Sequence, residues 1–176
     1  MLDAKSKDFL LDLLNTPSPT GFEWRGQKRW ADYVGQFADA VENDAYGTAW
    51  ATLKGAGKEP RRIMLEAHAD EIGFMIKAIS KEGYINLDRV GGSDVATARG
   101  RRLDILGDEG VVRGVIGNTA IHIRDNRDDE KVPKVHELFV DVGAKNEKEV
   151  AALGLRVGHP AVYADAAEFV GKDLLV

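Results

Sequence analysis

The sequence contains no cysteine, which excludes disulfide bonds, cysteine-ligated zinc sites and a cysteine nucleophile. Any metal ion must therefore be held by histidine nitrogen and carboxylate oxygen. Positive charge is also in deficit, because 24 Lys and Arg residues stand against 29 Asp and Glu residues, giving a formal net charge of −5. Nucleic-acid binding requires a surplus of basic side chains to neutralise phosphates, so neither DNA nor RNA is an expected partner.

Long hydrophobic runs are also lacking. The N-terminal stretch 1–15 is interrupted by Lys5, Lys7, Asp8 and Asp12, and no small-residue cleavage site follows it. These features fit neither a signal peptide nor a membrane span. We therefore expect a cytoplasmic location and no membrane partner.

The abundant glycine, 19 residues against five prolines, predicts many tight turns between short strands. Two helices are expected in the N-terminal part of the chain. The helical spacing of apolar residues predicts an amphipathic helix over residues 5–15. The pair Thr20 and Glu23 matches a capping box, so a second helix is expected to run to about Gln36.

Short segments rich in β-forming residues make up most of the remaining chain. They cover residues 40–42, 48–54, 62–67, 73–79, 84–87, 102–106, 111–116, 139–142 and 161–163. Several short strands joined by glycine-containing turns predict a small barrel or sandwich. A short helix capped by Asn146 and ending at Gly154 is expected before the last strand.

The segment 62–73 carries the candidate site. On a strand, alternation would place Ile63, Leu65, Ala67 and Ala69 on one face and Glu66, His68 and Asp70 on the other. A neutral imidazole nitrogen can bind a metal ion, and an acidic residue two positions later can accept the other ring N–H. His68 is therefore the candidate metal ligand and Asp70 its orienting partner, against the alternative of a hydrogen-bonded histidine at a strand end.

Several blocks of the sequence occur in the same order in one family. They are NTPSPTGFE (15–23), residues 46–55, AHADEIGFM (67–75), VRGVIG (112–117), residues 132–150 and LGLRVGHPAV (153–162). On these blocks the chain resembles the tetrahedral, or deblocking, aminopeptidases, a family of dinuclear metallopeptidases. The resemblance covers nearly the whole chain.

The resemblance implies an α/β fold. Residues 1–71 and 164–176 would form part of a zinc-peptidase-like α/β catalytic domain, which is incomplete here. Residues 72–163 would form an inserted small β-barrel, or PDZ-like, dimerisation domain. An unfinished catalytic sheet would leave exposed strand edges, which favour association or instability.

The resemblance also implies a function, the removal of N-terminal amino acids from peptides. His68 corresponds to the family's first metal ligand and Asp70 to the supporting catalytic aspartate. The complete enzyme would hold two divalent ions, zinc or cobalt, whereas this chain supplies at most a partial site, since it stops before the remaining ligands and the general base. It would form a homo-oligomer, with dimers building a larger tetrahedral assembly. The alternative is a non-catalytic assembly fragment of such an enzyme.

Four other features of the sequence contain side chains of a type that can bind a metal ion. Asp125-Asn126-Arg127 resembles the family's bridging-ligand motif, but it precedes the 132–150 block instead of following it, so a solvated loop is expected. His122 lies where the family tends to have a histidine, without an evident mechanism. His136 and His159 are isolated in the sequence, so surface or core roles are expected.

Overall fold

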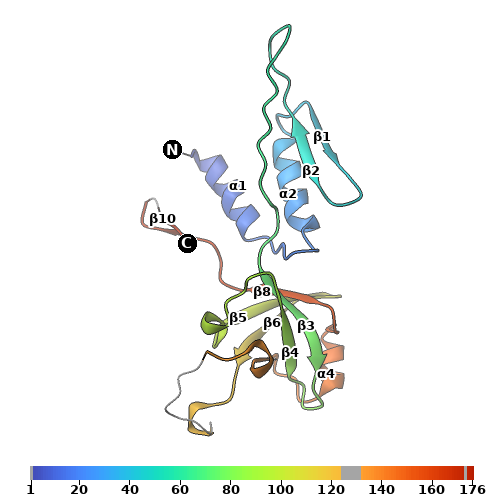
Figure 1. Ribbon diagram of the computed structural model, residues 1–176, viewed down its shortest axis with the longest axis vertical. Helices are drawn as coiled ribbons and strands as arrows, with labels where there is room; N and C mark the ends of the chain where they lie inside the picture. Colours follow the sequence, from blue (N-terminus) through green and yellow to red (C-terminus); the bar gives the residue numbers. More distant parts are fainter. Residues whose placement is uncertain (1, 124–131, 173) are drawn as a thin grey trace. The chain divides into compact units, whose positions relative to one another are not determined.

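The computed structural model describes residues 2–123, 132–172 and 174–176, and the chain divides into two compact units (Figure 1). One unit comprises Met1–Asp70 with Ala166–Val176, and the other comprises Glu71–Asp165. The catalytic and dimerisation roles that the sequence assigns to residues 1–71 with 164–176 and to residues 72–163 stay predictions.

Two helices begin the first unit. Helix α1 spans Ala4–Leu14, and its N-terminus is capped by the Asp3 carboxylate, which accepts from the Ser6 N–H at 2.7 Å. Helix α2 spans Trp24–Val34. The rings of Phe9 and Tyr33 stack with centroids 3.7 Å apart, which packs one helix against the other.

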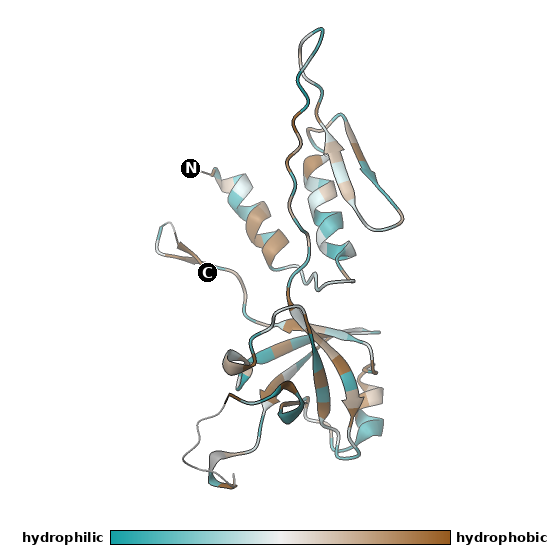
Figure 2. Cartoon of the chain, viewed as in Figure 1, coloured by the Kyte–Doolittle hydropathy of each residue, from teal (hydrophilic) through white to brown (hydrophobic). Residues whose placement is uncertain are grey.

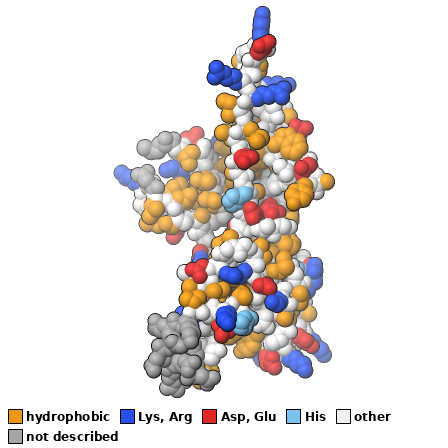
Figure 3. Space-filling view, in the orientation of Figure 1, with side chains coloured by type: hydrophobic (Ala, Val, Ile, Leu, Met, Phe, Trp, Pro, Cys, Tyr) orange, Lys and Arg blue, Asp and Glu red, His pale blue; other side chains and the backbone are white. Residues whose placement is uncertain are grey.

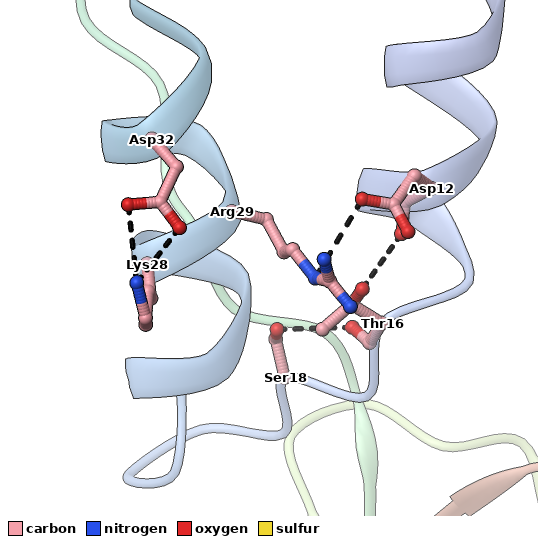
Figure 4. Close-up of polar contacts among 6 residues, drawn as sticks. All are labelled: Asp12, Thr16, Ser18, Lys28, Arg29 and Asp32. Atoms are coloured by element: carbon pink, nitrogen blue, oxygen red, sulfur yellow. Dashed lines mark hydrogen bonds and ion pairs between the residues drawn. The ribbon is translucent and has the colours of Figure 1, made fainter. Parts of the chain in front are cut away.

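The connection between α1 and α2 is tied down by polar contacts (Figure 4). The Arg29 guanidinium of α2 lies 3.6 Å from the Asp12 carboxylate of α1. The Thr16 hydroxyl donates to the Asp12 carbonyl at 2.6 Å, and the Ser18 hydroxyl donates to the Thr16 carbonyl at 3.1 Å. These bonds fix the start of the loop that leads into α2.

A hairpin and the C-terminal segment complete the first unit. Strands β1 (Ala40–Asn43) and β2 (Ala49–Thr52) pair antiparallel. Near the C-terminus, β9 (Phe169–Val170) pairs with β10 (Leu174–Leu175). The Asn15 side chain both accepts from the Ala167 N–H at 2.7 Å and donates to its carbonyl at 3.2 Å, which joins this segment to the end of α1.

The predicted strand over residues 62–67 is wrong. The structure gives residues 61–70 no strand assignment, although Figure 1 shows them running extended. A strand needs a neighbour for its backbone N–H and C=O groups, and no described segment of the first unit supplies one. The apolar residues that should have faced a core are instead open to solvent: Ile63 is 82%, Met64 81% and Leu65 93% exposed.

The first unit buries very little. Among its described residues only Ser18, Pro19, Gly26 and Val34 are buried. Figure 3 shows hydrophobic side chains on the surface of this part of the molecule. A core of this size cannot supply much hydrophobic stabilisation, so the contacts of the α1–α2 connection carry more weight than they would in a packed domain.

The second unit is a closed barrel of six antiparallel strands in the order β3-β4-β7-β6-β5-β8. The strands are β3 (Gly73–Ile79), β4 (Ile85–Val90), β5 (Arg102–Gly107), β6 (Gly110–Gly117), β7 (Phe139–Asp141) and β8 (Pro160–Tyr163). Of the two architectures predicted from the short strands, a small barrel or a sandwich, the structure shows the barrel. Closure pairs every strand on both sides, so the barrel has no free edge.

The barrel has a full apolar core, and Figure 2 shows hydrophobic residues recurring along its strands. The core comprises Phe74, Ile76, Ile85, Leu87, Ala98, Leu103, Ile105, Ile116, Leu138, Val140, Val150, Leu155 and Ala161. Helix α4 (Glu147–Ala152) contributes Val150. As predicted, Asn146 caps this helix, by accepting from the Lys148 and Glu149 N–H groups.

Three short elements that the sequence did not predict complete the barrel unit. They are α3 (Val95–Ala98) and the 3-10 helices η1 (Ile121–Ile123) and η2 (Val135–Glu137). Helix α3 is capped by the Asp94 carboxylate, which accepts from the Ala96 N–H at 2.9 Å. None of the helices in the described ranges has both the length and the apolar composition to traverse a bilayer.

Gly114 of β6 tests the packing of the barrel. A Cβ atom there would overlap the Val140 side chain and lie 3.0 Å from Val142 Cγ1, whereas a Cβ at Gly92 would meet nothing within 4 Å. We expect Gly114→Ala to lower the free energy of unfolding by about 1–3 kcal/mol, as overpacking does. Gly92→Ala should change it by less than about 0.5 kcal/mol. Urea denaturation followed by circular dichroism measures both, and equal stability of the two variants would contradict the packing described.

The exposed apolar stretch Ile63–Leu65 should promote association. We expect the average mass measured by static light scattering to rise with protein concentration, because an unpaired extended backbone and bare apolar side chains attract one another. Leu65→Lys should reduce this rise. Ala56→Lys adds the same charge in the same exposed segment and should leave most of it. A mass independent of concentration in the unmodified chain would contradict this expectation.

Candidate metal-ligand site

The His68 imidazole is solvent-exposed, and one of its two ring nitrogens, Nδ1, contacts Asp70. Its side chain is 84% exposed, and Nδ1 lies 3.0 Å from Asp70 Oδ1 and 2.9 Å from the Asp70 backbone oxygen. A carboxylate and a carbonyl can only accept, so Nδ1 carries the proton and donates. In the neutral ring this leaves the lone pair on Nε2, the nitrogen that is available to a metal ion.

A second residue holds the other oxygen of the same carboxylate. The Thr20 hydroxyl donates to Asp70 Oδ2 at 2.5 Å, across 50 positions of the sequence. Asp70 is thus fixed by partners on both of its oxygens. The hydrogen bond from Thr20 was not predicted from the sequence.

The predicted capping box is wrong, and the reason lies in a turn. The Phe22 N–H donates to the Pro19 carbonyl at 2.8 Å, and Gly21 has φ +87°, which makes Pro19–Phe22 a type II turn with Thr20 at its first corner. Helix α2 begins later, with Glu23 as N-cap and no side-chain cap hydrogen bond. The Glu23 carboxylate accepts instead from the Gly21 N–H at 2.6 Å.

The hydrogen bonds also set the charge of the site. The Thr20 hydroxyl lowers the pKa of Asp70 below its ordinary value of 3.8, and the bonds from its own backbone and from His68 add to this effect against desolvation. Asp70 is therefore ionised at neutral pH. As an anion it accepts from both Thr20 and His68.

A hollow adjoins Asp70 in the first unit. It is lined by Glu23, Gln27, Tyr46, Gly47, Thr48, Ala49, Ala67, Ala69 and Asp70. The Gln27 side chain donates to the Gly47 carbonyl, which ties α2 to the β1–β2 hairpin beside this hollow. Open space therefore lies next to the orienting carboxylate.

The fit to a metal ion is partial. His68 offers a free nitrogen and an orienting carboxylate, which is the usual arrangement of a metal-binding histidine. Catalytic zinc, however, typically has about three protein ligands. No group of three or more His, Asp or Glu side chains suited to a metal ion occurs in residues 2–123, 132–172 and 174–176.

The other histidines lie elsewhere in the fold. His122 and His136 belong to η1 and η2 of the barrel unit. His159 is buried, with Nε2 3.1 Å from Asp108 Oδ1 and Nδ1 accepting from the Arg156 N–H at 3.3 Å. This histidine has the core role that the sequence allowed.

The Asp108 carboxylate beside His159 also receives the Arg156 guanidinium, at 3.1 and 3.2 Å. These contacts hold the β5–β6 turn against the loop before β8.

The segment Asp125-Asn126-Arg127, which resembles the family's bridging-ligand motif and is expected to be a solvated loop, lies outside the described residues.

Comparison with known proteins agrees with this picture. The family model of the M42 glutamyl aminopeptidases matches residues 47–176. The chain belongs to the M42 glutamyl aminopeptidase family. The resemblance to the tetrahedral aminopeptidases is thereby confirmed, and solved structures of such enzymes share the fold.

Three relatives illustrate the match to the M42 family. The putative aminopeptidase SgcX of Escherichia coli (strain K12) is 31% identical over 78% of this chain and 37% of its own length. The TET aminopeptidase of the marine sediment archaeon Thaumarchaeota archaeon SCGC AB-539-E09 is 31% identical, with a TM-score of 0.85 over 94% of this chain and 46% of its own. The Pyrococcus horikoshii TET1 peptidase is 31% identical, with a TM-score of 0.80 over 94% and 48%. This M42 chain therefore spans less than half the length of each.

The lowered pKa of Asp70 has a testable consequence. A carboxyl whose pKa is lower in the folded chain contributes stability above its unfolded pKa, here 3.8, and loses that contribution as the pH falls through the folded pKa. We expect the ¹³C shift of the Asp70 carboxyl to titrate below 3.8, and Thr20→Val to raise its midpoint. Asp3, whose pKa is lowered by Ser6, should titrate unchanged in this variant. An Asp70 midpoint at or above 3.8 in the unmodified chain would contradict the geometry.

Proposed function

We propose that this chain is part of a metal-dependent aminopeptidase that removes N-terminal amino acids from peptides, with His68 as one metal ligand and Asp70 as the catalytic-site carboxylate that orients it. The observation that carries the proposal is an exposed imidazole whose Nδ1 is 3.0 Å from Asp70 Oδ1, which leaves Nε2 open. Membership of the M42 family supplies the reaction class.

Two divalent ions, zinc or cobalt, would supply the chemistry by acidifying a water molecule and polarising the scissile carbonyl. The residues of this chain have a narrower task. His68 binds through Nε2, and Asp70 fixes the ring orientation by holding the Nδ1 proton. The hollow beside Asp70 leaves room for part of a peptide substrate. With one histidine ligand, the chain alone is inactive in this proposal.

The barrel supports a second part of the proposal. Residues 72–163 would be the inserted, PDZ-like dimerisation domain, and residues 1–71 with 164–176 would belong to the α/β catalytic domain. Dimers would then build a larger homo-oligomer in the cytoplasm. The P. horikoshii TET1 peptidase, which can assemble into a tetrahedron or a large octahedral shell, supports this assembly by its similarity.

The aminopeptidase is favoured over a purely non-catalytic assembly fragment. Several similar proteins are named as aminopeptidases, and the exposed His68 belongs to the unit outside the barrel. A fragment used only for assembly would gain nothing from an imidazole held open to solvent.

Two measurements test the proposed function. Zn²⁺ should shift the ring-nitrogen signals of His68 in ¹⁵N spectra of the 176-residue chain. These shifting signals should be missing from His68→Gln and should be present in His136→Gln as in the unmodified chain. Aminoacyl-nitroanilides with added Zn²⁺ or Co²⁺ should release no product, because a catalytic site needs about three protein ligands. Turnover abolished by His68→Ala would refute the incomplete site, and a His68 unaffected by Zn²⁺ would refute its role as a ligand.

A further inference from the structure

We propose that Thr20 is a positioning residue for His68, because its hydroxyl fixes the Asp70 carboxylate that holds the imidazole with Nε2 turned outward to a divalent cation. This inference rests on the proposed role of His68 as a metal ligand. Thr20 itself would touch neither the metal ion nor the substrate. It acts through one intervening side chain.

Both oxygens of the Asp70 carboxylate have a hydrogen-bond partner. A carboxylate with a partner on one oxygen can still rotate about its terminal torsion, which is broad in energy. Here Oδ2 accepts from Thr20 at 2.5 Å while Oδ1 lies 3.0 Å from His68 Nδ1. Partners on both oxygens fix the carboxylate plane, and that plane directs the imidazole N–H.

The Thr20 residue that carries the hydroxyl is itself held in place by a turn. Thr20 occupies a corner of the Pro19–Phe22 turn, and the positive φ of Gly21 makes this turn accessible without strain. Pro19 is buried, so the turn is anchored at its start. The 61–70 segment, by contrast, has no strand neighbour to orient its side chains.

The chain just before the turn is packed against α2. Ser18 is buried, and a Cβ atom on Gly26 of α2 would collide with its hydroxyl oxygen. The residue that leads into the turn therefore packs directly on the backbone of α2. The orientation of Asp70 is imposed by the α1–α2 connection, which is far from His68 in the sequence.

The neighbouring contacts set the size of the expected effect. His68 Nδ1 also lies 2.9 Å from the Asp70 backbone oxygen, so the loss of Thr20 would leave one acceptor in place. Thr20 is exposed, and water can replace part of its bond. We therefore expect loss of the hydroxyl to weaken Zn²⁺ binding by about 3- to 10-fold, at or below the low end of the range for residues that support metal ligands.

The test compares three variants of the 176-residue chain without metal. Thr20→Val removes the hydroxyl at nearly constant shape, and Thr20→Ser restores it. Thr16→Val removes a hydroxyl from the same connection, one that donates to the Asp12 carbonyl and not to Asp70. Long-range ¹H–¹⁵N spectra at a pH where the ring is neutral report the tautomer of His68, which His68→Gln assigns.

We expect the Nδ1–H tautomer in the unmodified chain, in Thr20→Ser and in Thr16→Val, and a shift towards Nε2–H in Thr20→Val. An unchanged tautomer in Thr20→Val would overturn the inference. So would a predominant Nε2–H tautomer in the unmodified chain, a result that needs no variant to fold.

A Zn²⁺ titration read on the same nitrogens separates the two proposals. Weaker binding by Thr20→Val alone would support the positioning role. Normal binding by that variant, together with an unchanged tautomer, would overturn the role of Thr20 and leave the metal role of His68 intact. Failure of Zn²⁺ to perturb His68 in the unmodified chain would overturn the proposed ligand, and with it the metal part of this inference.

Discussion

The Asp70 carboxylate is the point on which the candidate site depends. It receives the Thr20 hydroxyl on one oxygen and the His68 imidazole on the other, so a loop near the N-terminus and the segment that carries the histidine meet at one anion. The hydrogen bonds favour the ionised carboxylate, and this carboxylate, together with the Asp70 backbone oxygen, accepts the proton of His68 Nδ1 and so leaves Nε2 without one in the neutral ring. An apolar or amide side chain at position 70 would lose the negative charge that joins these two contacts.

The two compact units are stabilised by different means. The barrel buries a continuous apolar core and pairs all six strands, so its backbone groups are satisfied within the unit. The first unit buries only four of its described residues and relies on a ring stack, side-chain hydrogen bonds and an ion pair around the α1–α2 connection. The candidate site lies in this sparsely packed unit, where polar tethers rather than a core position its side chains.

The barrel could be predicted from the sequence because its signals are local. Strands such as Arg102–Gly107 and Gly110–Gly117 are adjacent hairpin partners, and a glycine-containing turn between β-forming stretches is enough to indicate them. The segment 62–67 is also rich in β-forming residues, which is why a strand is expected there. A β-strand, however, forms only when another strand lies beside it, and the sequence does not show whether one does. The contact between Asp70 and the His68 ring is also expected from the sequence, since the two residues are only two positions apart, whereas the orienting role of Asp70 stays a prediction.

Thr20 and Glu23 show why the remaining part of the site escaped prediction. A threonine three residues before a glutamate satisfies the local rule for a capping box, in which each side chain bonds to backbone of the other residue. Three of these four residues, preceded by Pro19, also satisfy the rule for a type II turn, because Gly21 supplies the positive φ. In the structure the Glu23 carboxylate accepts from the Gly21 N–H, and the Thr20 hydroxyl donates to the Asp70 carboxylate instead of to the start of the helix. The acceptor of the Thr20 hydroxyl lies 50 positions away in the sequence, so the local pattern does not distinguish the two arrangements, and only the folded chain reveals that acceptor.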